Sequence, residues 1–324
     1  MEFLVFSDSH FYHNPSKSRI LGDGGYSWLE SQLDCLDQIF EYAYKNNVEW
    51  VIFNGDLFEE KNKINAQVYN RVWDKFNESK LLFTFNMGNH DFLTYERLSV
   101  LKPFSNKASL IELPFYLSGF KNSYCIIPYG MLDNEIVENK IGCELLFIHE
   151  EVYGLDAGYE IKSRYKVSDF SNWKYVFNGH IHKPQDIGNF YNIGSMVQQD
   201  FGEEGQLKRF LHYKDGEIKS IAIDHPLFVT YDNAVLADPN IVESIATDSE
   251  YFFRINIDSS QLNHEIFKRW NVKPNIIKSV KREFRIQSNL TIEDEIEKYV
   301  EISDTSLNKD KLKSTAREFI GGDK

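Results

Sequence analysis

Residues 50–56 read Trp-Val-Ile-Phe-Asn-Gly-Asp, in which four apolar residues lead into a polar turn that ends at Asp56. An apolar run of this length, closed by glycine and a polar residue, is typical of a strand buried in a sheet. The arrangement occurs at four other places along the chain. The other apolar runs occupy residues 3–6, 81–85, 145–148 and 175–177. The sequence therefore predicts five buried strands, each with polar residues at its carboxyl end.

The polar residues after these runs are of the types that bind divalent cations through nitrogen or oxygen. In chain order they are Asp8, His10, Asp56, Asn89, His90, Asp91, His149, His180 and His182. In open α/β sheets, ligands bind beyond the carboxyl ends of the strands. We therefore expect these side chains to share a single site.

Helical patterns separate some of the runs. Ser27 and Glu30 have the spacing of a capping box at the start of one helix. The apolar stripe of this helix consists of Leu29, Leu33, Leu36, Phe40 and Ala43. A second helix with a narrower apolar face is predicted over residues 65–78. Strands that alternate with helices in this way predict an α/β fold.

Composition limits the class of protein. A length of 324 residues predicts one large domain and a smaller one, at ~150 residues per domain. The net charge of −13 argues against nucleic-acid binding by the surface as a whole. No basic leader and no long apolar run is evident, so we expect a soluble, cytoplasmic protein that does not enter a membrane. The odd number and wide spacing of Cys35, Cys125 and Cys143 suggest neither a disulfide framework nor a thiolate metal site.

Imidazole and carboxylate groups without thiolate suit manganese, iron or zinc. Two such cations ~3.5 to 4 Å apart can clamp a phosphate and activate water for in-line attack. A pair of ions needs one carboxylate between them, and Asp56 is the residue that we expect to bridge. Asn89 can bind through its carbonyl oxygen without adding negative charge, which keeps such a centre electrophilic.

Five short motifs, taken in order, resemble those of the calcineurin-like metallophosphoesterase superfamily. They are Asp8-x-His10, Gly55-Asp56, Gly88-Asn89-His90-Asp91, His149 and Gly179-His180-x-His182. Within the superfamily, Gly55-Asp56-Leu57-Phe58 and the chain length resemble DNA nuclease subunits of the SbcD and Mre-eleven kind, including bacteriophage recombination nucleases. The resemblance implies a four-layer αββα core, with two facing sheets flanked by helices, a small α+β capping domain and a C-terminal helix.

The resemblance also implies which residues hold the metals. One ion would be bound by Asp8, His10, Asp56 and His182, and the other by Asp56, Asn89, His149 and His180. His90 would then be free to act in catalysis, as a proton donor to the leaving oxygen or as a group that stabilises the transition state. Glu59 and Asp91 are candidates for the residue that orients His90.

Two other functions remain open. A phosphatase or small-molecule phosphodiesterase could use the same two-metal core, and a non-catalytic scaffold could keep the fold. The complete set of ligands argues against the scaffold. Protein phosphatases of this superfamily carry Asp-Arg-Gly after the second motif, whereas Leu57 and Phe58 follow Asp56 here. The arginine that would clamp a phosphate is therefore missing from that position.

The part of the chain after Ser195 contains shorter alternating segments. Residues 209–223 predict a β-hairpin, and residues 251–257 a strand, followed by a helix near residues 262–270 and a strand toward Ile286. We predict a phosphoesterase domain over residues 1–228 and a capping domain over residues 229–300. A basic stretch at the end of this region could be a solvated face or a surface that binds DNA, and the resemblance to the nucleases favours DNA binding. Its cationic residues are Lys268, Arg269, Lys273, Lys278, Lys281, Arg282 and Arg285.

Residues 301–324 are expected to form a linker and a short amphipathic helix. Its apolar face consists of Leu312, Ala316, Phe319 and Ile320. Such a helix can pack on its own protein or dock in a partner's groove. In the resembling nucleases a C-terminal helical segment binds the coiled-coil base of an SMC-like ATPase, and the catalytic subunits form dimers.

The sequence and the resemblance together predict a two-metal-dependent DNA nuclease subunit of a recombination or repair complex. The expected metal is Mn²⁺, with Mg²⁺ as the alternative. The resemblance adds 3'-to-5' exonuclease activity on duplex DNA, endonuclease activity on single strands, and regulation by the ATPase partner. If the chain is phage-encoded, the expected location is the host cytoplasm.

Overall fold

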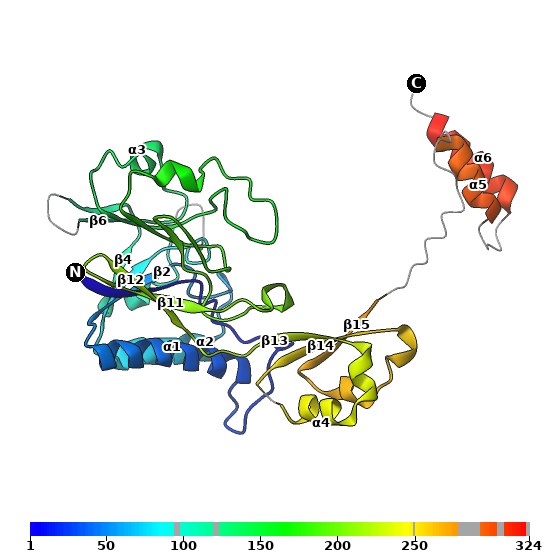
Figure 1. Cartoon of the computed structure of the whole chain (residues 1–324), viewed down its shortest axis with the longest axis horizontal. Coiled ribbons are helices and arrows are strands. Elements are labelled where there is room, and N and C mark those ends of the chain that lie inside the picture. The colour runs from blue at the N-terminus through cyan, green and yellow to red at the C-terminus, as the bar shows by residue number, and fades with distance from the viewer. Residues whose placement is uncertain (94–97, 119–122, 249, 278–291, 303–307, 322–324) are drawn as a thin grey trace. The chain divides into compact units, whose positions relative to one another are not determined.

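The structure of the protein, a computed structural model, describes residues 1–93, 98–118, 123–248, 250–277, 292–302 and 308–321. Contacts divide the chain into two compact units, Met1–Ile276 and Ile277–Lys324. The larger unit contains two six-stranded sheets that face each other and a third sheet of three strands (Figure 1).

The first sheet has the strand order β12-β11-β1-β2-β3-β4. In that order its strands span Glu217–Ala222, Arg209–Lys214, Glu2–Phe6, Trp50–Asn54, Leu82–Asn86 and Ala108–Ile111. Strands β1 to β4 are parallel, whereas β11 pairs antiparallel with β1 and with β12. The predicted hairpin of residues 209–223 therefore adds to the sheet beside the first strand of the chain.

The second sheet has the order β5-β6-β7-β8-β10-β9. Its strands span Phe115–Leu117, Tyr124–Ile127, Leu145–His149, Tyr175–Gly179, Phe190–Asn192 and Gln185–Ile187. The four central strands are parallel, and the two short edge strands are antiparallel to their neighbours. All five predicted buried strands are present, as β1, β2 and β3 in the first sheet and β7 and β8 in the second.

The two sheets pack through a core made by every second residue of their strands. Phe3 and Val5 of β1 point toward the second sheet, whereas Leu4 and Phe6 point to the opposite side. The ring of Phe3 lies 5.4 Å from that of Phe147 on β7 and contacts it edge to face. Because both faces of these strands are buried, their sequences are continuously apolar.

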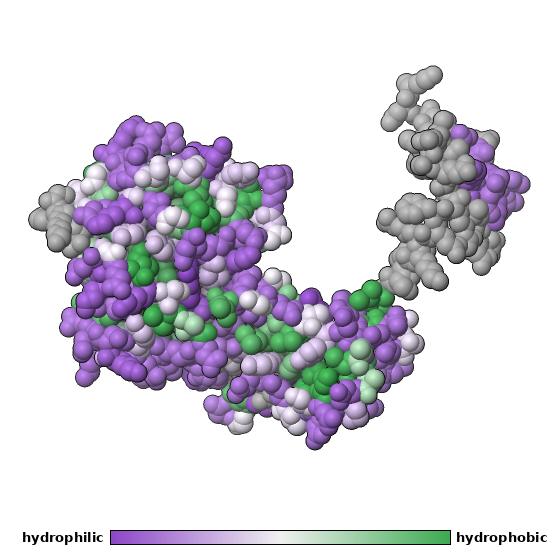
Figure 2. Space-filling view, viewed as in Figure 1, coloured by the Kyte–Doolittle hydropathy of each residue, from purple (hydrophilic) through white to green (hydrophobic). Residues whose placement is uncertain are grey.

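Helices α1 (Ser27–Asn46) and α2 (Ala66–Glu78) cover the outer face of the first sheet. The apolar stripe predicted for α1 is buried, and its outward face is hydrophilic (Figure 2). Asn65 caps α2 as its side chain accepts backbone N–H groups. The capping box predicted for Ser27 and Glu30 is wrong, because the helix is capped at Tyr26 and Glu30 instead pairs with Arg71 at 2.5 Å.

The outer face of the second sheet has a thinner cover, made of the four-residue helix α3 (Asn134–Val137), the 3₁₀ helix η2 (Val167–Phe170) and the loops around them. The predicted α/β core with two large facing sheets and flanking helices is confirmed. Loops contribute as much as helices to its fourth layer.

A third, parallel sheet follows the core and contains β13 (Phe228–Asp232), β14 (Phe252–Ile257) and β15 (Val272–Ile276). Helix α4 (Pro239–Thr247) packs on one of its faces. The helix predicted near residues 262–270 is wrong, since only the short 3₁₀ helices η5 (Ser259–Gln261) and η6 (Glu265–Lys268) form there. After η6 the chain continues to Trp270, whose ring packs edge-on against Phe252.

The second unit contains α5 (Ile292–Ile302) and α6 (Lys309–Gly321), which pack against each other. Helix α6 was predicted, whereas α5 was not. Lys313 of α6 pairs with Glu301 of α5 at 2.8 Å. In the described part of the chain, no helix combines the length and apolar character needed to cross a bilayer. The predicted boundaries of the phosphoesterase and capping domains, at residues 228 and 300, stay predictions.

Candidate metal centre

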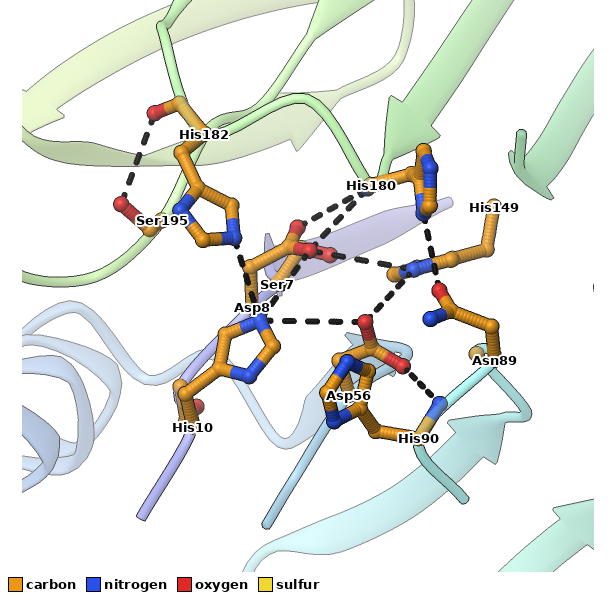
Figure 3. A network of polar contacts seen from close by, with 12 residues as sticks. Ser7, Asp8, His10, Asp56, Asn89, His90, His149, His180, His182 and Ser195 are labelled. Carbon is orange, nitrogen blue, oxygen red and sulfur yellow. Dashed lines mark hydrogen bonds and ion pairs between the residues drawn. The ribbon is translucent and has the colours of Figure 1, made fainter. Parts of the chain in front are cut away.

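The carboxyl ends of β1, β2, β3, β7 and β8 meet at one edge of the two-sheet core. The structure brings all seven predicted metal ligands together at this edge (Figure 3). They are Asp8, His10, Asp56, Asn89, His149, His180 and His182. Three come from the loops after β1 and β2, and the other four come from the loops and strand ends at β3, β7 and β8.

One group consists of Asp8, His10 and His182, whose ligand atoms lie within 4.8 Å of one another. The Nε2 atoms of His10 and His182 face each other at 3.1 Å. His10 Nε2 also lies 3.9 Å from the Asp8 carboxylate. Two ring nitrogens that converge beside a carboxylate form a suitable set of donors for a cation.

A second group consists of Asp56, His149 and His180, and a third of His10, Asp56 and His90. His149 Nε2 lies 3.2 Å from Asp56 Oδ2, and His180 Nδ1 lies 2.8 Å from Asn89 Oδ1. Asp56 Oδ2 is also 3.7 Å from His10 Nε2 in the first group. The Asp56 carboxylate therefore lies within reach of the first two groups.

Burial and charge fit a cation at this place. Asp8 is 0% exposed and Asp56 is 2% exposed. Burial raises the pKa of the Asp8 carboxyl, but His149 and His10 outweigh it and lower this pKa to about 2. Burial lowers the pKa of His149, yet the carboxylates of Asp56 and Asp8 raise it to about 10. His149 is 0% exposed, and its Nε2 faces the Asp56 carboxylate. A metal ion would supply the positive charge that these buried carboxylates require.

Residues behind the ligands fix the orientation of the imidazole rings. His149 Nδ1 lies 2.7 Å from the Asn54 carbonyl oxygen, and His182 Nδ1 lies 2.8 Å from Glu203 Oε1. His10 Nδ1 lies 2.7 Å from Glu59 Oε2. Such partners select the tautomer that leaves the other ring nitrogen free for a metal. Asn54 and Glu203 were not predicted from the sequence.

Glu59 and Asp91, the two residues predicted to orient His90, have different positions and contacts in the structure. The backbone carbonyl of Glu59 lies 2.6 Å from His90 Nδ1, while its side chain contacts His10. The Asp91 carboxylate accepts backbone N–H groups of Asp56, Leu57 and Gly88 at 2.8 to 3.1 Å. Asp91 therefore ties the loops after β2 and β3 together. Burial and the nearby Asp56 charge raise its pKa to about 7.

The ligand loops have a strained backbone. Asp8, His10, Asp56 and His180 all have positive φ, between 44° and 77°. Conformations of this kind are uncommon for residues other than glycine and concentrate at functional sites. A Cβ atom added at Gly55 would lie 2.3 Å from His149 Nδ1, and one at Gly179 would lie 2.6 Å from the same atom. Both glycines of the motifs are therefore needed to make room for that ring.

The predicted DNA-binding residues lie only partly in the described structure. Lys268 pairs with Glu265 at 2.7 Å, and Arg269 donates to the Asp248 carbonyl. Lys273 is exposed on β15. The remaining four, Lys278, Lys281, Arg282 and Arg285, lie outside the described residues.

Two of the four predicted partner-binding side chains are described, and both lie on α6. Leu312 and Ala316 are half-buried. The side chains of Phe319 and Ile320 lie outside the described part of the structure. Because α6 packs on α5, part of its surface is covered within its own unit.

Buried carboxylates and imidazoles that converge from two groups, with one carboxylate in reach of both, define a two-metal hydrolase centre of the type that acts on phosphate esters. The chain belongs to the calcineurin-like phosphoesterase family, whose sequence profile matches residues 1–184. Members of this family are metal-dependent hydrolases that use two metal ions. Among curated protein sequences, a search finds no match.

A search of solved structures finds similar chains at low sequence identity. The protein TT1561 of Thermus thermophilus is 11% identical, with a TM-score of 0.42, and the match covers 69% of this chain and 99% of that one. A dimetal phosphatase from Danio rerio is also 11% identical, with a TM-score of 0.43 and the same coverage. The nuclease MPE of Pseudomonas putida is 13% identical, with a TM-score of 0.32, covering 68% of this chain and 87% of that one.

Proposed function

We propose that this metal-dependent phosphoesterase is a DNA nuclease subunit that cleaves phosphodiesters. The observation that carries the proposal is the burial of Leu57 and Phe58, both 0% exposed, directly after Asp56. A phosphomonoester carries about two negative charges at neutral pH, and the protein phosphatases of the superfamily carry a clamping arginine there. A diester carries one negative charge and has less need of that cation. The buried apolar pair therefore favours a diester.

The surroundings of the site also suit an extended polar substrate. A groove of about 380 Å³ runs beside His180 and His182 and is open to solvent along part of its length. Tyr159, which is 59% exposed, lies on its wall. An exposed aromatic ring beside the metal centre can stack on an unpaired base.

In the proposed mechanism, Asp8, His10, Asp56 and His182 would hold one cation, and Asp56, Asn89, His149 and His180 would hold the other. When bound, the two ions would supply Lewis acidity toward the phosphate oxygens and the attacking water. His90 is placed to move a proton. Its Nδ1 donates to the Glu59 carbonyl at 2.6 Å, which fixes the ring and leaves Nε2 as the atom that would exchange a proton with the leaving oxygen.

Other parts of the proposal rest on the resemblance to the SbcD and Mre-eleven nucleases. They are Mn²⁺ as the native metal, 3'-to-5' exonuclease and single-strand endonuclease activity, a role in recombination or repair, an SMC-like ATPase partner, homodimerisation and a phage origin. Helix α6 is the segment that we assign to the ATPase. The alternatives are a phosphatase and a small-molecule phosphodiesterase.

The proposal is tested by comparing substrates with the purified chain in Mn²⁺. We expect cleavage of labelled DNA and of bis-p-nitrophenyl phosphate, with much slower turnover of p-nitrophenyl phosphate. Chelation with EDTA should abolish all turnover, and added Mn²⁺ should restore it. Faster turnover of the monoester than of either diester would instead identify a phosphatase. A chain that binds two ions and turns over none of the three would be a scaffold.

A second experiment addresses the basic stretch. Reversing the charges of Lys278, Lys281 and Arg282 to glutamate should weaken DNA binding and reduce the slope of log affinity against log salt by about 0.9 for each phosphate that the variant no longer neutralises. Fluorescence anisotropy over a range of salt concentrations measures this slope. The matched control reverses Lys45, Lys80 and Lys219, three exposed lysines far along the sequence from this stretch. Equal slopes for the two triple variants would rule out a DNA-binding role for the stretch.

A further inference from the structure

The ring of His182 is held by a residue that lies outside all five sequence motifs. Glu203, in the 3₁₀ helix η3 (Phe201–Glu203), accepts a hydrogen bond from His182 Nδ1 through Oε1 at 2.8 Å. Since Nδ1 carries the proton, the free nitrogen is Nε2, which faces His10 Nε2 at 3.1 Å. The Glu203 carboxylate therefore determines which nitrogen of His182 points into the metal centre.

Glu203 is itself held from several directions. Lys208 Nζ lies 2.7 Å from Glu203 Oε2 and also donates to the His182 carbonyl oxygen at 2.9 Å. Lys208 is only 1% exposed. The backbone N–H of Gln199 donates to Glu203 Oε2 at 3.0 Å. One buried ammonium group thus contacts the backbone of His182 as well as the carboxylate that orients its ring.

The segment that carries Glu203 is fixed against the three-stranded sheet. The ring of Phe201 contacts that of Phe228 on β13 edge to face, with 4.9 Å between centroids. Glu204, the next residue, accepts the backbone N–H of Thr230 at 2.7 Å. Anchored on both sides, η3 has little freedom to carry Glu203 away from His182.

We infer that Glu203 is a positioning residue that presents His182 to the metal centre, and that the buried Lys208 holds Glu203 in place. The inference rests on the proposed two-metal phosphoesterase only in that His182 is a metal ligand. Both residues follow residue 184, where the match to the family profile ends. A carboxylate behind a metal-binding histidine keeps the ring in the ligating orientation and makes its nitrogen a better donor.

A purely structural ion pair between Lys208 and Glu203 would give a different result from a positioning role. Loss of a structural pair lowers the melting temperature and leaves the affinities for both ions unchanged. Loss of a positioning residue weakens binding of the ion next to His182 and leaves the other ion unaffected. Metal binding measured without substrate therefore distinguishes the two roles.

The test uses Glu203→Gln in the full chain, with Glu243→Gln at an exposed position of α4 as the matched control. Calorimetric titration with Mn²⁺ should show one of the two ions bound about 10 to 100-fold more weakly in Glu203→Gln. Titration with Co²⁺ should change the visible spectrum of one equivalent only. The control should behave as the wild type in both experiments.

Wild-type affinities for both ions in Glu203→Gln and in Glu203→Ala, with a lowered melting temperature, would overturn the inference. Lys208→Met gives an independent check and should weaken the same ion. Because no substrate is present, a wild-type chain that binds two ions but cuts no DNA would contradict the nuclease proposal alone. A chain whose affinities for both ions are unchanged in His182→Gln would contradict both, because His182 would then not be a metal ligand.

Discussion

Asp56→Asn should lower the rate of phosphodiester cleavage by about 10³-fold or more. The Asp56 carboxylate is buried, lies 3.2 Å from His149 Nε2 and 3.7 Å from His10 Nε2, and is within reach of both sets of ligands. Asparagine keeps the size of the side chain and removes its charge. Both ions would therefore lose the carboxylate that they are expected to share. Loss of several kcal/mol of charge stabilisation corresponds to a rate change of this order.

The measurements are kcat/KM for bis-p-nitrophenyl phosphate in Mn²⁺ and the metal content of the dialysed protein. Asp74→Asn, at an exposed position of α2, is the matched control and should match the wild type in both. The melting temperature shows whether the variant is folded. A folded Asp56→Asn chain with two bound ions and at least a tenth of the wild-type rate would show that Asp56 does not bridge them.

His90→Gln should lower kcat by about 10² to 10⁴-fold, the range for loss of a general acid or base, without changing metal content. Departure of a DNA 3'-oxygen requires a proton, whereas p-nitrophenolate leaves readily without one. The defect should therefore be larger on DNA than on bis-p-nitrophenyl phosphate. This difference separates proton transfer from a general effect on the fold of the site.

His90 also lies within 4.8 Å of possible ligand atoms of His10 and Asp56, so the same variant tests a second role. A His90→Gln chain that has lost an ion would identify His90 as a ligand and remove it from the proton-transfer step. His13→Gln is the control, since the His13 ring packs on Tyr26 at 4.8 Å and is not among the grouped ligand residues.

The five buried strands, and the order of the metal ligands that follow them, could be predicted because a strand buried on both faces has a continuously apolar sequence. Runs such as residues 50–53 and 145–148 are long, apolar and closed by polar residues, and the site forms where parallel strands end. Short edge strands such as β5 and β9 have no such pattern in the sequence, because a strand that is exposed on one side can have any composition. Helix α5 was missed although Ile292, Ile296 and Val300 have helical spacing.

The residues that support the ligands could not be predicted for a different reason. Glu203 is one of several acidic residues between Asp200 and Glu204, and only the folded segment selects it as the partner of His182. The sequence did not indicate that Lys208 is buried, since lysine is almost always exposed unless it is paired. Asn54 acts through its backbone carbonyl, which any residue could supply.

The antiparallel pairing of β1 with β11 joins residues 2–5 to residues 211–214. During synthesis on a ribosome, the first strand emerges early but keeps one edge unpaired until β11 has also been made. The loop that follows β1 carries Asp8 and His10, so this part of the metal centre also lacks its full support until β11 has been made. Nascent chains that stall before β11 should therefore hold an unfinished first sheet and an exposed apolar edge, which makes them targets for chaperones and proteases.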